Sequence, residues 1–460
     1  MPSPNSYSTG SVFTVKPKWS QPVRLHEVEA GAGDAPAHEP WFHLAVVQFE
    51  DDGRATNPAQ TQDAIDLIRS ARNAFPDGAV VVVFIHGWHH NAAWNRSPST
   101  PATDFDGDEH FHAFRLVLES LAIREMERRD HRRVVGILLG WNGIPATGVG
   151  RALSGVPVVT HTSFGTRYAV AERIGAEAAF QDTLRRLITT TKEPLPGGSG
   201  RESPLIMIGH SMGALMLESG LLALLKDQTR PLISQALSSG AVQLKSSQGL
   251  VSFPNLILAL NSAADSRIAK EIVQVFEWHK LEKVASADDI SFSPPIIMSV
   301  TATDDTDTRD MWRLAQGLYA PWRRTDGHDD ALITHDFLLT APNSICRKQP
   351  DVRDFGQNWH CLRRPSPLST ASPAIPIDLP TAERKGVDDA FVPHARYTIT
   401  PRVPTRDAKL MWVFQVPPAI MKNHNDVFND QARSLILGLI QISGAVASIA
   451  EDWAHSFEPE

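Results

Sequence analysis

The chain has 460 residues and a formal net charge of −8, with 42% hydrophobic and 21% charged residues. This is the composition of a globular protein with a large buried core, so it excludes wholesale disorder. The mild acidity also argues against a dedicated nucleic-acid-binding protein, which would carry a strongly basic balance. Proline is the one anomaly, because its 33 residues make up about 7% of the chain where about 5% is usual.

The N-terminal region and the cysteines bear on the compartment. Residues 1–20 contain no apolar run of the kind found in secretory signals, so we expect a cytoplasmic protein, with secretion by a signal-independent route left open. Cys346 and Cys361 are too few for a disulfide scaffold, and one bridge or two reduced thiols both fit.

The longest uncharged apolar-rich run, residues 434–450, lies at the lower limit of membrane-spanning length. Its interior holds Gln441 and Ser443, which favour a buried helix of a soluble protein over a membrane span. Membrane contact is therefore not expected.

Apolar patterning along the chain predicts alternating strands and helices. Residues 1–40 are rich in Pro, Ser, Gly and Ala and predict an extended N-terminal extension. Continuous apolar runs predict strands at 41–49, 79–85, 133–139, 204–208, 256–260, 296–301 and 410–415. Helical spacing predicts helices at 57–75, 111–126, 167–190, 214–225, 268–276 and 428–448. This alternation predicts an α/β fold with a mostly parallel central sheet flanked by helices.

The prolines are concentrated in one segment. Residues 321–404 hold 11 of the 33 prolines and both cysteines, and they lack sustained periodicity. We expect this segment to be a long irregular insertion, similar to a lid or cap, that covers the cleft. The core would then consist of residues 41–320 and 405–460.

The most informative motif is the sequence GHSMG at residues 209–213, preceded by an apolar strand and followed by a helix. A G-x-S-x-G motif in this context forms a sharp turn that raises its serine, here Ser211, above the sheet. Gly209 and Gly213 are small because the turn brings backbones close together, and His210 fills the position before the serine. The alternative is a glycine turn with an incidental serine, but the strand–motif–helix context favours a nucleophile.

A nucleophilic serine needs an oxyanion hole. The strand at 79–85 ends in His86 and Gly87, and Gly87 allows a turn that directs the Trp88 N–H toward an acyl oxygen. The Met212 N–H would be the second donor, and each such donor contributes about 3–4 kcal/mol to the transition state in comparable sites.

The rival interpretation is a metal site formed by His86, His89 and His90, but their spacing does not match a helical ligand pair. The D-x-D-x-D pattern at 104–108 departs from a calcium loop in its glycine position and predicts a polar surface loop. We therefore expect neither a metal nor a cofactor.

The acid and the base are expected on loops after later strands. The strand at 296–301 is followed by Asp304, Asp305 and Asp307, of which Asp305 is the preferred acid and Asp304 the reserve. His424 precedes the last helix and is the expected base. The alternative bases, all inside the proline-rich insertion, are His328, His335, His360 and His394.

Five segments carry a resemblance to a known family: VFIHGWHHNA, GWNG (140–143), GHSMG, SVTATDD and NHNDVF. Through these segments, the chain resembles the α/β-hydrolase superfamily, in its lipase and esterase branch. They are similar to a group of uncharacterised microbial hydrolases, in which the acid precedes the position held here by Thr306. The order Ser211, Asp305, His424 is also that of α/β-hydrolases. The resemblance implies an α/β-hydrolase fold, no cofactor and a Ser–His–Asp mechanism with an acyl-enzyme intermediate.

The expected function is therefore a carboxylesterase or lipase that acts on a small ester with an apolar acyl or aryl group. An amidase or a phospholipase with the same triad is the first alternative, because the fold does not determine the substrate. A non-catalytic interaction protein of the same fold is the second, although all three triad residue types are present. Nucleic acid is not expected as a partner, and the sequence does not indicate the oligomeric state.

Overall fold

The structure is a computed structural model. It describes residues 12–15, 42–75, 77–90, 109–127, 132–143, 157–195, 202–239, 253–264, 268–269, 271–272, 275, 296–302, 304–305, 359–363, 375–379, 395–401, 411–416, 418 and 420–443.

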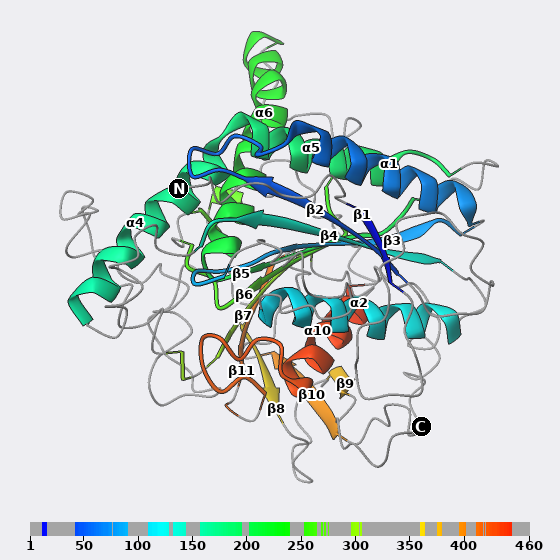
Figure 1. The fold of residues 1–460 in the computed structure, drawn as a ribbon, viewed down its shortest axis with the longest axis vertical. Coiled ribbons are helices and arrows are strands. Elements are labelled where there is room, and N and C mark those ends of the chain that lie inside the picture. Colours follow the sequence, from blue (N-terminus) through cyan, green and yellow to red (C-terminus); the bar gives the residue numbers. More distant parts are fainter. Residues whose placement is uncertain are drawn as a thin grey trace, which may run out of the picture.

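The described strands form one sheet, shown in Figure 1, with the order β1-β2-β4-β3-β5-β6-β7-β11-β8-β10-β9. The strands are β1 (Val12–Val15), β2 (Phe42–Phe49), β3 (Ala79–Ile85), β4 (Arg133–Trp141), β5 (Leu205–His210), β6 (Leu256–Leu260), β7 (Ile297–Ala302), β8 (Trp359–Arg363), β9 (Ile375–Leu379), β10 (Ala395–Pro401) and β11 (Met411–Val416). Neighbours from β2 to β8 run parallel, whereas β1 and the β8–β10 and β10–β9 pairs are antiparallel. The predicted α/β architecture is confirmed.

Helices cover both faces of the sheet. The described helices are α1 (Pro58–Ala74), α2 (Glu109–Glu127), α4 (Pro157–Ala176), α5 (Ala178–Lys192), α6 (Met212–Ser239) and α10 (Asp430–Ile442). In β3, Phe84 packs in the core on the α2 and α10 side, whereas Val83 packs in the core on the α1, α4, α5 and α6 side. Figure 1 shows these two layers on opposite sides of the sheet. Burial on both faces explains the continuous apolar runs of the central strands.

Helix α1 begins where its capping residues predict. The Asn57 side chain accepts a hydrogen bond from the Ala59 N–H at 3.0 Å, and Pro58 occupies the first turn, where no N–H is needed. Asn429 caps α10 in the same way, accepting from the Ala432 N–H at 2.8 Å.

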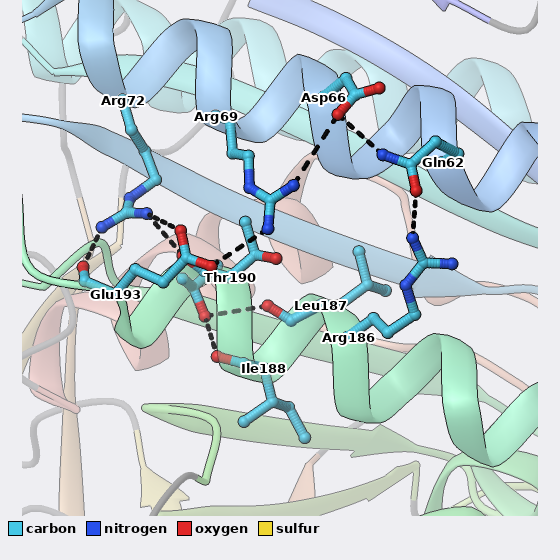
Figure 2. Close-up of polar contacts among 10 residues, drawn as sticks. Gln62, Asp66, Arg69, Arg72, Arg186, Leu187, Ile188, Thr190 and Glu193 are labelled. Atoms are coloured by element: carbon cyan, nitrogen blue, oxygen red, sulfur yellow. Dashed lines mark hydrogen bonds and ion pairs between the residues drawn. The ribbon is translucent and has the colours of Figure 1, made fainter.

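Polar contacts join α1 to α5 on the outer layer, as Figure 2 shows. Arg72 is only 3% exposed, and its guanidinium donates to the Thr190 carbonyl at 2.6 Å and also to the Glu193 carbonyl. Arg69, which is about half exposed, forms an ion pair with Glu193 at 3.2 Å. The buried arginine therefore satisfies carbonyls at the C-terminal end of α5, which the helix itself leaves without partners.

Two helical predictions, at 167–190 and 214–225, differ from the structure. The single helix expected at 167–190 is two helices, α4 and α5, separated at Glu177, whose backbone is extended. Apolar spacing continues across this break, so periodicity alone did not reveal it. Helix α4 begins ten residues earlier than expected, and α6 continues from 225 to Ser239.

The N-terminal extension and the proline-rich insertion also contain regular structure. Strand β1 lies inside the extension and pairs with β2 at the sheet edge. Strands β8, β9 and β10 lie inside 321–404 and extend the sheet beyond β11, so the expectation of a wholly irregular segment was wrong. Strand β9 is at the sheet edge, whereas β8 and β10 pair on both sides. None of the three has a continuous apolar run, so their sequence signal is weak. Three predictions concern residues that the structure does not describe, and they stay predictions. They are the covering of the cleft by the insertion, the domain boundaries, and a disulfide between Cys346 and Cys361.

The apolar run near the C-terminus packs in the interior. Residues 435–440, in α10, are buried in the core that also contains α2, as the prediction of a buried helix requires. Among the described residues, no helix combines the length and apolar character that a membrane span requires.

Candidate active site

The candidate residues gather at the carboxyl ends of the central strands. Ser211 follows β5, Asp305 follows β7, and His424 follows β11. Gly87 and Trp88 follow β3, which lies beside β5 in the sheet. Parallel strands bring these ends to a single edge, where open α/β sheets generally bind ligands.

Ser211 has a strained backbone that its neighbours hold in place. Its φ angle is 54°, in the left-handed region that non-glycine residues rarely adopt. Its N–H donates to the Leu260 carbonyl at 3.0 Å, and its carbonyl accepts from Ala263 N–H at 3.1 Å. A Cβ at Gly213 would lie 2.3 Å from the Ile85 carbonyl oxygen, and one at Gly209 would lie 2.5 Å from the Ala214 Cα, so both positions require glycine.

Ser211, His424 and Asp305 form a hydrogen-bonded chain. The His424 Nε2 lies 2.7 Å from the Ser211 Oγ, and its Nδ1 lies 2.8 Å from the Asp305 Oδ2. Ser211 is 2% exposed, His424 8% and Asp305 0%. A buried carboxylate can only accept, so the Nδ1–H donates to Asp305 and the Nε2 lone pair is left to accept from the serine hydroxyl. This is the tautomer that a general base needs.

Of the alternative acid and bases, the structure describes the side chain of Asp304 alone. Asp304 is exposed, in contrast to the fully buried Asp305. His360 lies in β8, where only the backbone is described, and His328, His335 and His394 lie outside the described residues, as does the D-x-D-x-D segment. Asp305 contacts His424, and His424 in turn contacts Ser211.

The loop after β3 lies directly against the serine. A Cβ on Gly87 would be 2.9 Å from the Ser211 Cβ and 2.8 Å from the His210 Nδ1, so only glycine fits. Trp88 is the next residue, and Met212 is the first residue of α6. The N–H groups of a first helical turn lack intrahelical acceptors, which leaves the Met212 N–H for another acceptor. Met212 therefore follows the serine directly in the chain, and Gly87, the residue before Trp88, packs against the serine.

His86 is held by the backbone and is not available as a metal ligand. The Trp141 N–H donates to its Nε2 at 3.2 Å, so its Nδ1 carries the proton and donates to the Gly87 carbonyl at 3.0 Å. The described residues contain no group of His, Cys, Asp or Glu side chains arranged to hold a metal ion.

The GWNG segment after β4 supports the loop after β3. The Trp141 indole N–H donates to the His86 carbonyl at 2.9 Å, and its ring stacks on the His86 imidazole. The Gly143 carbonyl accepts from the His89 N–H at 3.1 Å, and the Gly143 N–H donates to the His90 carbonyl at 3.0 Å. These bonds join the two loops into one unit.

Arg167 of α4 anchors this unit, and sequence reasoning did not identify it. The side chain is buried, and its Nη1 donates to the Asn142 carbonyl at 2.8 Å and to the Asp51 carboxylate at 2.9 Å. Arg167 thereby connects the loop after β4 to the loop after β2. Its position on a helix of unremarkable periodicity gave no signal of this role.

Two further residues that hold His424 were not recognised as such from the sequence. The His424 carbonyl oxygen accepts from the His210 Nε2–H and from the Asn261 Nδ2–H, both at 2.9 Å. His210 is completely buried, and this burial and the nearby His424 lower its pKa well below the ordinary value, so it stays neutral. His210 was expected only as part of the motif, and Asn261 was not considered.

Other histidines surround His210. The His110 ring lies edge-on to it with centroids 4.7 Å apart, and His90 stacks on His110 at 3.5 Å. Burial also lowers the pKa of His110. The environment behind His424 therefore includes two buried, uncharged imidazoles, those of His210 and His110.

Comparisons of the chain with protein-family models, with curated proteins and with solved structures give no significant match.

Proposed function

We propose that this protein is a serine hydrolase of the α/β-hydrolase superfamily that cleaves carboxylic esters through an acyl-enzyme intermediate. The observation that carries the proposal is the continuous chain of contacts from Ser211 through His424 to Asp305, with separations of 2.7 and 2.8 Å. The left-handed backbone of Ser211, between a strand and a helix, further supports its assignment as the nucleophile.

Each step of the proposed reaction uses a described group. The His424 Nε2 takes the hydroxyl proton as the Ser211 Oγ attacks the carbonyl carbon, and Asp305 stabilises the resulting imidazolium. The Trp88 and Met212 N–H groups donate to the oxyanion. The protonated His424 then gives its proton to the departing alkoxide, so that the alcohol leaves and the acyl group stays on Ser211. A water molecule, deprotonated by His424, then attacks the acyl carbonyl carbon. The bond from this carbon to the Ser211 Oγ breaks, His424 returns the proton to the Oγ, and the acid is released.

Turnover of short- and long-chain p-nitrophenyl esters tests this proposal. We expect hydrolysis by the wild type and a loss of about 10⁴-fold or more in kcat for Ser211→Ala, because the nucleophile is removed. Ser120→Ala is the matched control, since the Ser120 hydroxyl donates only to its own helix, at the Leu116 carbonyl. Undiminished activity in Ser211→Ala would refute the mechanism.

The substrate class is tested with the same two proteins. A fluorophosphonate probe that labels the wild type but not Ser211→Ala would report an activated serine whatever its natural substrate. Labelling without turnover of any ester would indicate an amide or phospholipid acyl group, which the same residues would cleave. The absence of both labelling and turnover would favour a non-catalytic protein.

A further inference from the structure

We infer that Asn261 is a positioning residue for His424: its amide holds the backbone of the base and the backbone of the acid-bearing strand in one fixed arrangement. The geometric part of this inference stands on the contacts alone. Its consequence for turnover rests on the function proposed above.

Asn261 occupies an unusual position immediately after β6. Its side chain is completely buried and its φ angle is 43°, a left-handed conformation in which Asn is one of the few tolerated residues. Its N–H donates to the Val300 carbonyl at 2.8 Å, so its backbone is attached to β7. The strand end therefore turns inward and carries a polar side chain into the space between β7 and the His424 loop.

The two ends of the Asn261 amide contact two different segments. The Nδ2–H donates to the His424 carbonyl at 2.9 Å, and the Oδ1 accepts from the Ala302 N–H at 2.8 Å. Ala302 ends β7, and its own carbonyl accepts from the Asp305 N–H at 3.3 Å. One side chain thus connects the peptide of the base to the turn that carries the acid, over a sequence separation that no local structure could bridge.

This double role requires an amide. A carboxylate at position 261 would accept from Ala302 but offer no donor to His424, and an apolar side chain would provide neither group. The second donor to the same carbonyl, the His210 Nε2–H at 2.9 Å, restrains it from the β5 side. Together the two donors occupy both lone pairs of the His424 carbonyl oxygen and fix the peptide from which the imidazole extends.

Substitution of Asn261 is expected to disturb the alignment of His424 with Ser211 and Asp305, although all three side chains remain present. If the His424 peptide rotates, Nε2 moves relative to the Ser211 Oγ and Nδ1 moves relative to the Asp305 Oδ2. A displacement of about 1 Å in such a site costs about 10²-fold in rate. We therefore expect substitution of Asn261 to lower kcat about 10- to 100-fold with little change in KM.

The test compares Asn261→Leu and Asn261→Asp with the wild type and with Asn255→Leu. Asn255 is a matched control, because it lies at the opposite end of β6, where its Oδ1 accepts from the Leu205 N–H at 2.9 Å. The first readout is the Nδ1 proton of His424 in histidine-labelled protein, assigned by its absence in His424→Gln. We expect this resonance to weaken or exchange faster in both Asn261 variants and to persist in Asn255→Leu. The second readout is kcat and KM for the best p-nitrophenyl ester.

The outcomes separate the two claims. If a folded Asn261 variant, judged by its circular dichroism and thermal transition, keeps the wild-type Nδ1 resonance and kcat within twofold, the positioning role is overturned. Should Asn261→Leu not fold, the isosteric Asn261→Asp decides the question. A wild type that hydrolyses no ester and binds no fluorophosphonate would refute the proposed function, whereas loss of the Nδ1 resonance in the variants would still support the positioning of His424.

Discussion

At the residue scale, the adjacent residues Asp304 and Asp305 have different environments, and this difference favours Asp305 as the candidate acid. Asp304 is exposed, whereas Asp305 is fully buried and lies 2.8 Å from the His424 Nδ1. A buried carboxylate requires a hydrogen-bond donor, and the imidazole N–H provides one. The sequence prefers Asp305 and keeps Asp304 in reserve, and the path of the turn after β7 buries the first and exposes the second.

Substitution of the two aspartates by asparagine should give very different enzymes. Asp305→Asn leaves the shape of the side chain unchanged but favours the wrong imidazole tautomer, so we expect kcat for ester hydrolysis to fall about 10⁴-fold. Asp304→Asn changes an exposed side chain, so we expect kcat within about twofold of the wild type. Steady-state kinetics on the same ester measure both, and a larger loss in Asp304→Asn would move the acid to that residue.

At the scale of elements, the site depends on loops that are joined across strand ends. Arg167 of α4 connects the loops after β2 and β4, and the backbone of Gly143 connects the latter to the loop of Gly87 and Trp88. On the outer layer, Arg72 of α1 serves a different purpose, since it satisfies the carbonyl groups at the end of α5. The contacts of Arg167 and Gly143 position the candidate site, whereas the contacts of Arg72 stabilise the fold.

Removal of Arg72 should therefore destabilise the protein without changing its chemistry. We expect Arg72→Ala to lower the free energy of unfolding by about 3 kcal/mol, because buried carbonyls lose charged donors. Arg69→Ala is the control and should cost less than about 1 kcal/mol, since its ion pair with Glu193 is solvent-exposed. Urea unfolding of the three proteins measures this, and equal losses in both variants would contradict the role of Arg72 burial.

The α1 and α5 contacts lie away from the triad, so kcat should be unaffected in either variant while the protein is folded. A loss of kcat in Arg72→Ala that exceeded its unfolded fraction would show that α1 also positions the loops.

For the whole molecule, buried neutral histidines make stability depend on pH. Burial and the nearby Arg133 lower the pKa of His43, on β2, from 6.5 to about 4. Between these two values the unfolded chain binds a proton at His43 that the folded protein does not bind. The free energy of unfolding must therefore decrease as the pH falls from 6.5 toward 4. His210 and His110 act in the same direction, because burial lowers the pKa of both.

Urea unfolding at several pH values between 7 and 4.5 tests this linkage. We expect a steadily lower free energy of unfolding toward acid in the wild type and a shallower slope in His43→Gln, which lacks one of the titrating groups. An unchanged slope in His43→Gln would show that His43 is already protonated in the folded protein or is accessible to water.

The arrangement of strands and helices was largely predictable, because burial on both faces leaves a direct record in the sequence. The strand predicted at 79–85 matches β3 at both ends, and the Asn57 cap marks the beginning of α1. The break at Glu177 and the strands β8 to β10 were not predicted, because they depend on neighbouring elements more than on local apolar spacing.

The sequence by itself determined the α/β architecture and the three residue types of the candidate triad, because apolar periodicity and the G-x-S-x-G turn are local properties of the chain. Only the tertiary structure showed that the preferred Asp305 is buried against His424 while Asp304 is exposed, and it revealed the roles of Asn261 and Arg167. These roles consist of contacts between segments far apart in the chain, such as the 2.9 Å hydrogen bond from Asn261 to the His424 carbonyl. A buried amide and a helical arginine carry no local sign of the groups they will bind, so their function is set only when the strand ends come together.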